Sequence, residues 1–196
     1  MKITSLKAGK RGSILVYADG EYILSVPREV FLKTNIKIGY EITDEEIETI
    51  SSEVEFYKAK SRAYNILSYR SHSKKELEEK IKRKTGILNP ERVVSKMEEI
   101  GLIDDKKYAL EYASHLFKNK LYGIKRIAFE LSKKGISKEN INFAIENLDM
   151  NEYENIQKIV SKKNMEDEKE KKKTIANLIR RGYSWEKINS VLNNDF

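Results

Sequence analysis

Cysteine is absent from the 196 residues, and the chain has only two prolines and two histidines. Without cysteine there are no disulfides, no thiolate nucleophiles and no cysteine-based metal sites. The histidines, His72 and His115, have no second histidine at ligand spacing, so we expect a structural role for each and predict neither a metal nor a cofactor. No nucleophile paired with a base can be proposed from residue types, and we therefore predict a protein that is not an enzyme.

Long apolar runs are also missing. No stretch approaches the roughly 18 apolar residues that span a membrane. The first twenty residues carry Lys2, Lys7, Lys10 and Arg11 in place of an apolar signal segment. We therefore expect a cytoplasmic protein without a membrane partner. Hydrophobic residues still make up 39% of the chain, which is enough to bury a core.

Charge is abundant and unbalanced. Charged residues make up 35% of the chain, and lysine plus arginine exceed aspartate plus glutamate by 38 to 31, which gives a formal net charge of +7. This surplus suits a polyanionic partner such as nucleic acid, but it suits solubility equally well.

Residues 1–43 differ in pattern from the rest and are predicted to form a small β-rich module. Residues 13–18 (SILVYA) and 21–26 (EYILSV) are β-prone runs joined by Asp19-Gly20, a pair that accepts positive φ at both positions of a tight turn. Because an isolated hairpin is marginal in water, we expect a further strand near residues 2–7 and a short helix that has Pro27 at its first position and continues over residues 28–33.

From Thr43 onward the pattern is helical to the end of the chain. Thr43 and Glu46 have the spacing of a capping box, and apolar residues then recur at helical intervals as far as Leu67. The run to Arg70 is long for one globular helix, so Ser51-Ser52 is the predicted site of a bend or break.

Three glycines mark a repeat within the helical region. Gly86, Gly135 and Gly182 lie 49 and 47 residues apart, and each follows a basic amphipathic helix and precedes a second helix. Such a glycine is the usual left-handed residue after a helix C-terminus. The helices that follow the glycines are predicted to have their N-caps at Asn89, Ser137 and Ser184.

Upstream positions follow the same period. Leu77, Ile127 and Ile175 are 50 and 48 residues apart, and a further helix precedes each of them. The pattern predicts a mainly α fold of three tandem three-helix repeats, which form an elongated array beside the β-rich N-terminal module. The predicted domains are residues 1–43 for the N-terminal module, 44–105 for a linker helix and repeat 1, 106–150 for repeat 2, and 151–196 for repeat 3.

Two short segments that look functional are better explained by structure. Residues 9–13 (GKRGS) resemble a phosphate-binding loop, but the upstream glycine is missing and a strand follows in place of a helix. Asp104 and Asp105 stand at a predicted helix start, where carboxylates cap the helix and stabilise its dipole.

Basic residues recur on the predicted repeat helices. A row of them could follow a phosphate backbone or an acidic protein groove, while the competing interpretation is a solvated surface with intrahelical pairs, such as Arg126 with Glu130. Tyr122, Tyr183 and Trp185 could stack on bases or pack in the core. The candidate residues for binding a partner or nucleic acid are Arg70, Lys75, Lys125, Arg126, Lys134 and Arg181.

Three motifs carry a family resemblance. Residues 67–77 (LSYRSHSKKEL), 101–109 (GLIDDKKYA) and 123–136 (GIKRIAFELSKKGI) resemble, in this order, the motifs of the RecX family of bacterial regulatory proteins. The resemblance covers about residues 56–192. It is weaker in the third repeat, and the β-rich start lies outside it.

The resemblance implies a monomeric, non-enzymatic regulator in DNA repair, homologous recombination and the SOS response. Its expected partner is the RecA recombinase filament on single-stranded DNA, whose ATPase, strand exchange and coprotease activities it would modulate, in the inhibitory direction. The alternative functions are a general DNA-binding helical-repeat protein, which would grip phosphates without the recombinase, and a scaffold that binds only protein.

Overall fold

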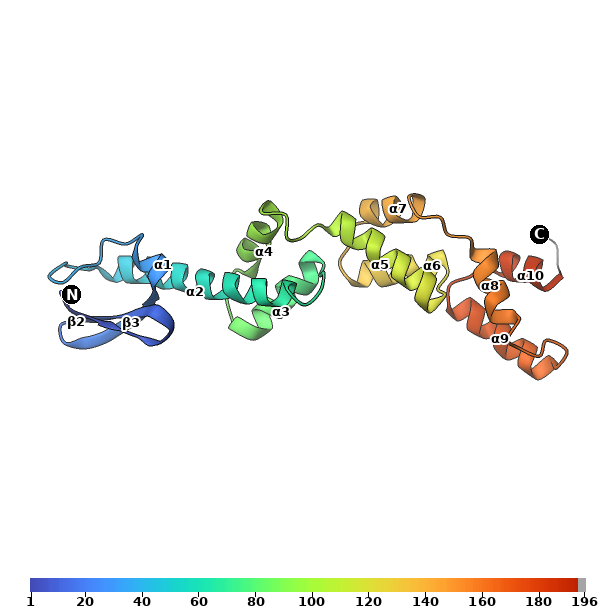
Figure 1. Cartoon of the computed structure of the whole chain (residues 1–196), viewed down its shortest axis with the longest axis horizontal. Helices are drawn as coiled ribbons and strands as arrows, with labels where there is room; N and C mark the ends of the chain where they lie inside the picture. Colours follow the sequence, from blue (N-terminus) through green and yellow to red (C-terminus); the bar gives the residue numbers. More distant parts are fainter. Residues whose placement is uncertain (194–196) are drawn as a thin grey trace. The chain divides into compact units, whose positions relative to one another are not determined.

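The computed structural model describes residues 1–193, which contain ten α-helices and one three-stranded sheet (Figure 1). The predicted mainly α fold with a small β-rich N-terminal module is confirmed. The chain divides into two compact units. The first unit contains Met1–Arg70 and Leu77–Ile100, and the second contains Ser71–Glu76 and, of the described residues, 101–193.

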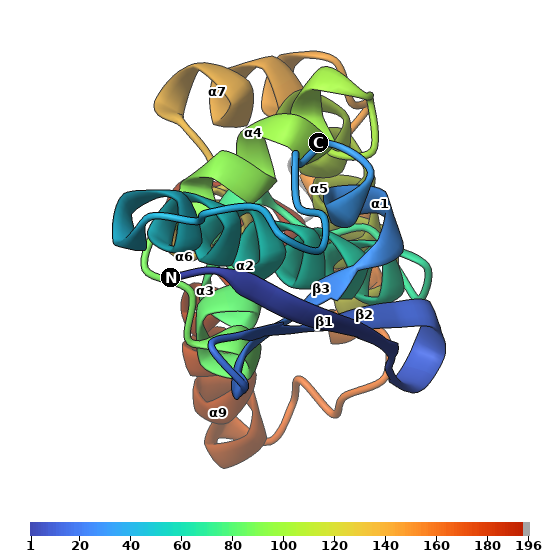
Figure 2. The ribbon, with the colours of Figure 1, turned by 90° about the vertical axis from the view of Figure 1, so that its left-hand side faces the viewer.

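The sheet of the first unit is antiparallel. Its strands are β1 (Ile3–Ala8), β2 (Ser13–Ala18) and β3 (Glu21–Pro27), hydrogen-bonded in that order (Figure 2). Asp19 and Gly20 connect β2 to β3 with φ angles of 50° and 89°. The predicted hairpin, its turn and the additional strand are therefore confirmed.

Two helices complete the core of the first unit. The predicted short helix is α1 (Arg28–Phe31), which begins one residue later and ends two residues earlier than predicted, because Pro27 is its N-cap and the last residue of β3. Helix α2 (Asp44–Leu67) begins with the predicted capping box, in which the Glu46 backbone N–H donates to Thr43 Oγ1 at 3.2 Å and the Thr43 N–H donates to Glu46 Oε2 at 2.9 Å. The core side chains buried here are Ile3, Val16, Leu24, Val26, Val30, Ile36, Ile42 and Val54.

The predicted break at Ser51-Ser52 is wrong, because α2 runs without interruption for 24 residues. Each serine in a helix lowers its stability by only about 0.5 kcal/mol relative to a good helix former. Within the first unit, α2 packs against β3 and α1 and also against α4 (Pro90–Glu99). Packing of α2 against these elements offsets the modest helix propensity of the serines.

The first unit also contains most of α3 (Lys74–Thr85), which is followed by Gly86 and α4. Leu77 and Ile81 of α3 are completely buried, as are Val93 and Met97 of α4. On each helix the two buried side chains are four residues apart and therefore lie on one face.

The second unit contains two groups of three helices. The first group is α5 (Asp105–Lys120), α6 (Ile124–Lys133) and α7 (Lys138–Glu146), and it buries Ala109, Ala113, Ile127, Leu131 and Ala144 completely. The second group is α8 (Glu152–Val160), α9 (Glu168–Arg180) and α10 (Trp185–Asn193), with Ile156, Leu178 and Ile188 completely buried. The limits predicted for the individual repeats stay predictions.

The repeated glycines have the predicted backbone conformation. Gly86, Gly135 and Gly182 adopt φ angles of 69°, 79° and 92°. Ser137 Oγ accepts from the Asn140 N–H at 3.2 Å, and Ser184 Oγ accepts from the Lys187 N–H at 3.4 Å, so both predicted serine caps are confirmed. Asn89 lies at the predicted N-cap of α4, but its side chain makes no capping hydrogen bond in the described part of the chain.

Candidate interaction surface in the helical repeats

The basic residues before Gly135 and Gly182 lie at two junctions inside the second unit. At the first junction, the Ser73 hydroxyl, at the start of α3, donates to the Lys134 carbonyl oxygen at 2.6 Å. At the second junction, the Gly123 backbone N–H, at the start of α6, donates to the Arg181 carbonyl oxygen at 2.9 Å. Lys134 and Arg181 each precede a repeated glycine, so the two junctions use equivalent positions.

Acidic side chains cap the same helix starts. Asp105 Oδ1 accepts from the Lys74 backbone N–H at 2.9 Å, and Glu152 Oε1 accepts from the Ile124 backbone N–H at 2.9 Å. Each carboxylate satisfies an N–H of a neighbouring helix that has no partner within its own helix. The predicted capping role of the aspartate pair is thereby divided, because Asp104 caps its own helix α5 while Asp105 caps α3.

The glycines at these junctions are required for space as well as for conformation. A Cβ on Gly135 would lie 2.6 Å from Lys75 Cβ, and a Cβ on Gly182 would lie 2.7 Å from Arg126 Cβ. Positive φ already disfavours any side chain there. The paired basic residue and glycine in KKG and RRG therefore mark a close contact between consecutive repeats.

Lys134 belongs to a polar network at the first junction. Its Nζ lies 2.5 Å from Glu76 Oε1, and the Tyr108 hydroxyl donates to Glu76 Oε2 at 3.1 Å. The Glu76 side chain is only 13% exposed and that of Lys134 is 30% exposed. This ion pair connects α3 to α5 and α6 inside the second unit, so the lysine charge is already partnered.

Arg181 has an equivalent structural role at the second junction. Its Nε donates to Asn177 Oδ1 at 2.7 Å, and its Nη1 donates to the carbonyl oxygens of Lys120 and Leu121. These carbonyls lie at the C-terminal end of α5, where carbonyl oxygens have no partner within the helix. Arg181 thus caps a neighbouring helix with its side chain.

Arg126 pairs within its own helix, as the competing interpretation predicted. Its Nη2 lies 2.6 Å from Glu130 Oε1, and its guanidinium lies 5.7 Å from the ring centroid of Tyr122 and 5.3 Å from that of Phe129. Arg181 also approaches the Tyr122 ring, at 6.0 Å. The structure therefore brings Arg126 and Arg181 together around one tyrosine.

Two of the three aromatic candidates contribute to packing. Tyr183 is 3% exposed, and its hydroxyl donates to the Leu121 carbonyl oxygen at 2.9 Å. Burial raises the pKa of the Tyr183 phenol far above its usual range, and the nearby Glu152 carboxylate adds to the shift. Tyr122 is half-buried, whereas Trp185 is 56% exposed.

The remaining candidates are exposed. Lys75 and Lys125 lie on the surface of the second unit, and neither has an ion pair with any residue in 1–193. The stem of Lys75 covers Gly135, so the structure brings Lys75 close to Lys134. Arg70 is exposed on the first unit. Binding of a partner by these candidates stays a prediction.

The six candidate residues predicted from the sequence do not include Lys173, an equivalent lysine of the third repeat. Lys75, Lys125 and Lys173 each stand two residues before the equivalent apolar positions Leu77, Ile127 and Ile175. Lys173 is exposed and, within residues 1–193, has no ion pair. The period of the repeat alone identifies Lys173 as the residue equivalent to Lys75 and Lys125.

The described residues contain no group of three or more histidine, aspartate or glutamate side chains placed to hold a metal ion. His72 is buried, while His115 is exposed, lies 3.2 Å from the Asn119 amide and stacks on Tyr112. No helix within residues 1–193 has the length and apolar character to cross a membrane.

Known proteins resemble this chain over most of its length. Family models of the second and third three-helix domains of RecX match residues 104–145 and 151–192. A regulatory protein RecX from Clostridioides difficile strain 630 is 31% identical, over 97% of this chain and 94% of its own. One from Caldanaerobacter subterraneus subsp. tengcongensis is 32% identical, over 96% of each chain.

Solved structures agree with these similarities. A crystal structure of regulatory protein RecX superposes with a TM-score of 0.77 at 25% identity, over 98% of both chains. The crystal structure of RecX from Lactobacillus salivarius superposes with a TM-score of 0.60 at 26% identity, over 71% of this chain and 96% of that chain.

Proposed function

Because the chain belongs to the RecX family, we propose that it is a non-enzymatic regulator that binds the RecA recombinase filament on single-stranded DNA. We further propose that binding lowers the ATPase, strand exchange and coprotease activities of the filament. The similarity to regulatory proteins over 97% of the chain is the observation that carries this proposal. Those relatives are regulatory proteins, which supports a regulatory function. The proposed partner, RecA, is what the resemblance of the three motifs to the RecX family implies.

The proposed contact surface comprises the exposed lysines at equivalent repeat positions, Lys75, Lys125 and Lys173. All three belong to the second unit. Because each stands at the same place in its repeat, the three can make similar contacts with the repeating surface of a filament. Their charges are available for acidic groups, in contrast to that of Lys134, which is paired with Glu76.

Several weak contacts made by one chain act together. Once the first repeat is bound, the next binds at a high effective concentration, so the combined affinity exceeds that of any single contact. A chain bound in this way would inhibit by occupying the filament surface and hindering either subunit exchange or the motion coupled to ATP hydrolysis. Regulation of this kind requires no active site.

The test is the ATPase rate of RecA on single-stranded DNA as the full chain is added. We expect the wild type to lower the rate when it is substoichiometric to RecA, and the variant Lys75→Glu/Lys125→Glu/Lys173→Glu to need more than about tenfold higher concentration, because several contacts are lost together. The control, Lys37→Glu/Lys84→Glu/Lys107→Glu, has the same net charge and reverses three other exposed lysines.

The result separates the proposed function from its alternative. If the control variant loses as much activity as the test variant, general charge is responsible and the lysine surface is wrong. If the wild type binds the DNA equally well without RecA and lowers the ATPase rate only by covering DNA, the chain is a general DNA-binding protein.

A further inference from the structure

The first unit contains a broad groove that the repeats do not share. It lies between the loop after β1, the start of α1 and the second half of α2, and its volume is about 1380 Å³. The loop includes a short 3-10 turn, Lys10–Gly12. The charged and polar lining residues, in chain order, are Lys10, Arg11, Ser13, Ser25, Arg28, Glu29, Lys58, Ser61, Arg62 and Asn65.

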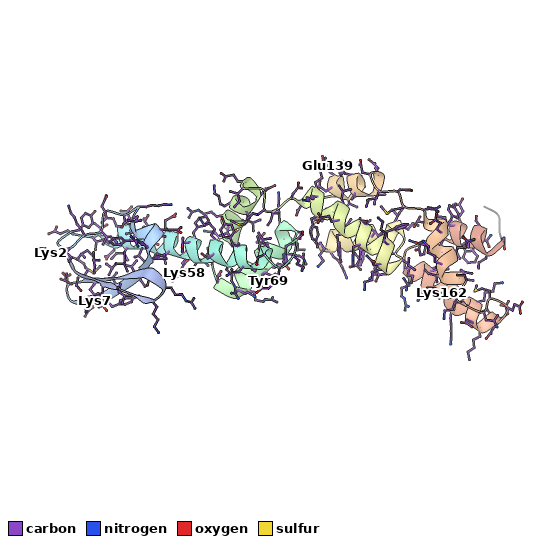
Figure 3. All side chains as sticks on the ribbon, viewed as in Figure 1. Lys2, Lys7, Lys58, Tyr69, Glu139 and Lys162 are labelled. Carbon is purple, nitrogen blue, oxygen red and sulfur yellow. The ribbon has the colours of Figure 1, made fainter. Side chains whose placement is uncertain are left out.

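Five cations from three elements line this groove. They are Lys10 and Arg11 from the loop, Arg28 from α1, and Lys58 and Arg62 from α2, one turn apart (Figure 3 labels Lys58). All are exposed, and none has an ion pair with another residue in 1–193. Glu29 is the carboxylate in the lining. The groove therefore concentrates uncompensated positive charge.

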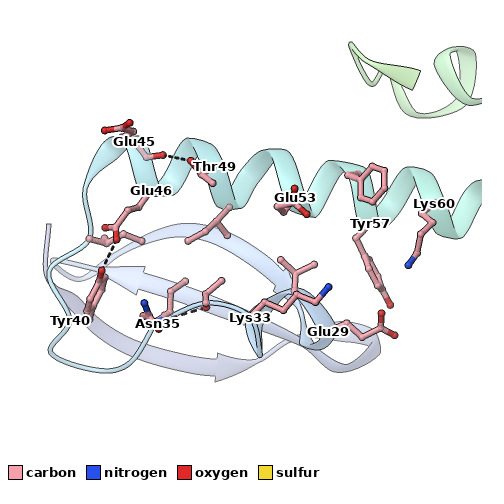
Figure 4. A pocket seen from close by; sticks show the side chains of 16 residues that line it. Glu29, Lys33, Asn35, Tyr40, Glu45, Glu46, Thr49, Glu53, Tyr57 and Lys60 are labelled. Carbon is pink, nitrogen blue, oxygen red and sulfur yellow. Dashed lines mark hydrogen bonds between the residues drawn. The ribbon is translucent and has the colours of Figure 1, made fainter. Parts of the chain in front are cut away.

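A second hollow of the same unit has the opposite character (Figure 4). Its volume is about 430 Å³, and it shares Glu29 and Tyr57 with the groove. Its other carboxylates include Glu46, which accepts from the Tyr40 hydroxyl at 2.5 Å, and Glu53, which pairs with Arg92 at 2.6 Å. Glu46 and Glu53 of that hollow therefore have partners within the chain, whereas the five groove cations have no ion pair among the described residues.

Two hydrogen bonds of Ser13 stabilise the loop that carries two of the cations. The Ser13 hydroxyl donates to the Lys10 carbonyl oxygen at 3.0 Å and accepts from the Ser25 hydroxyl at 3.0 Å. Arg11 has a φ of 56°, which is costly for a residue with a side chain and persists only where its surroundings hold it. Lys10 and Arg11 thus lie on a loop that these hydrogen bonds connect to β2 and β3.

We propose that this groove binds the phosphodiester backbone of nucleic acid without reading its sequence. Exposed lysines and arginines with serine hydroxyls are the side chains that contact phosphates. The aromatic ring in the lining, Tyr57, is half-buried, so contacts to the backbone are favoured over stacking on bases. The proposal goes beyond the regulation of RecA, because it gives the first unit a nucleic-acid contact of its own.

The experiment measures binding of the full chain to a fluorescently labelled single-stranded DNA of mixed sequence, without recombinase, between about 50 and 200 mM salt. The variant is Lys58→Gln/Arg62→Gln, which keeps good helix formers in α2. Loss of two phosphate contacts should reduce the slope of log K against log salt by about 1.4, which corresponds to roughly 25-fold weaker binding near 0.1 M salt.

Two further variants make the test specific to the groove. Lys10→Gln/Arg11→Gln removes the loop cations and should cause a similar loss of slope, while circular dichroism checks that each variant is folded. Lys82→Gln/Arg83→Gln removes one lysine and one arginine from exposed positions of α3 in the same unit and should leave the affinity within about twofold, since no phosphate contact is lost.

Equal losses in the groove and control variants would overturn the proposal, because attraction by net charge would then explain binding. The proposal also fails if polyglutamate of equal charge binds the wild type as tightly as DNA does and is equally sensitive to the groove variants, because the partner would then be an acidic protein. Since RecA is absent, neither result depends on the proposed regulation.

Discussion

The two units use the same kinds of basic residue in different ways. At the repeat junctions of the second unit, Lys134 and Arg181 are partly buried and bonded to Glu76 and to the end of α5. In the groove of the first unit, Arg28, Lys58 and Arg62 are exposed and, among the described residues, have no ion pair. A cation with a buried partner contributes to folding, whereas an unpaired exposed cation is available to a ligand.

This difference limits what a count of positive charge can show. The net charge of +7 is compatible with both roles, and so is clustering along the sequence. Only the partner of each side chain separates a structural lysine from a binding lysine.

The largest expected effect is at the glycine of the second junction. Gly182→Ala places a side chain at a φ of 92° and against Arg126, so we expect the free energy of unfolding to fall by about 2–4 kcal/mol. The fluorescence of Trp185, the single tryptophan of the chain, reports the unfolding of this unit in denaturant.

Gly101→Ala is the matched control, because Gly101 has a φ of 72° in the same unit but no atom within 4 Å of the added Cβ. Gly101→Ala should lower the free energy of unfolding only by the cost of placing a side chain at positive φ, about 1 kcal/mol. Equal losses for the two variants would mean that close packing at the junction contributes nothing.

A smaller effect is expected from the first junction. Glu76→Gln removes the charge that pairs with Lys134 and accepts from Tyr108, in a side chain that is 13% exposed, and we expect a loss of about 2 kcal/mol in unfolding free energy. Glu168→Gln is the control, since Glu168 is 74% exposed and 4.0 Å from Lys171. Its loss should stay near 0.5 kcal/mol or below, and a loss as large as that of Glu76→Gln would contradict the structural role of the junction.

The smallest effect concerns a paired carboxylate of the first unit. The hydrogen bond from the Tyr40 hydroxyl, followed by that from the Thr43 backbone N–H, lowers the pKa of Glu46. A lowered pKa in the folded state stabilises the protein above the unfolded pKa of about 4.3, and this contribution is lost as the pH falls through the folded pKa. Tyr40→Phe should therefore raise the pKa of Glu46 and flatten the acid side of the stability profile.

An NMR titration of the Glu46 carboxyl carbon measures this shift. Tyr22→Phe is the control, because Tyr22 is an exposed residue of β3 that packs on Tyr17 and should leave the Glu46 titration unchanged. An unchanged Glu46 pKa in Tyr40→Phe would show that the tyrosine hydrogen bond is not its cause.

Features that are determined by residues close together in the sequence could be predicted. The Asp19-Gly20 turn, the Thr43 capping box and the left-handed glycines depend on residues close together in the chain, and the structure confirms each of them. The Arg126–Glu130 pair could be foreseen for the same reason, since its members are four residues apart on one helix.

Features that depend on distant residues could not be predicted. Glu76, which pairs with Lys134, lies 58 residues away, and the α5 carbonyls that accept from Arg181 lie 61 and 60 residues away, so no local pattern shows that these two cations have partners in a neighbouring repeat. The groove was missed because its cations come from three separate elements, and the GKRGS segment was tested only as a loop before a helix. The break expected at Ser51-Ser52 failed because packing of α2 on the sheet and on α4 overrides local propensity.

The most direct test of this division between units removes one lysine from each and measures two properties of both variants. Lys58→Gln should reduce the salt slope of single-stranded DNA binding by about 0.7 and leave the unfolding free energy within about 0.5 kcal/mol of wild type. Lys134→Gln should keep the slope and lower the unfolding free energy of the second unit by about 1–2 kcal/mol. Equal effects of the two substitutions on both properties would contradict the account.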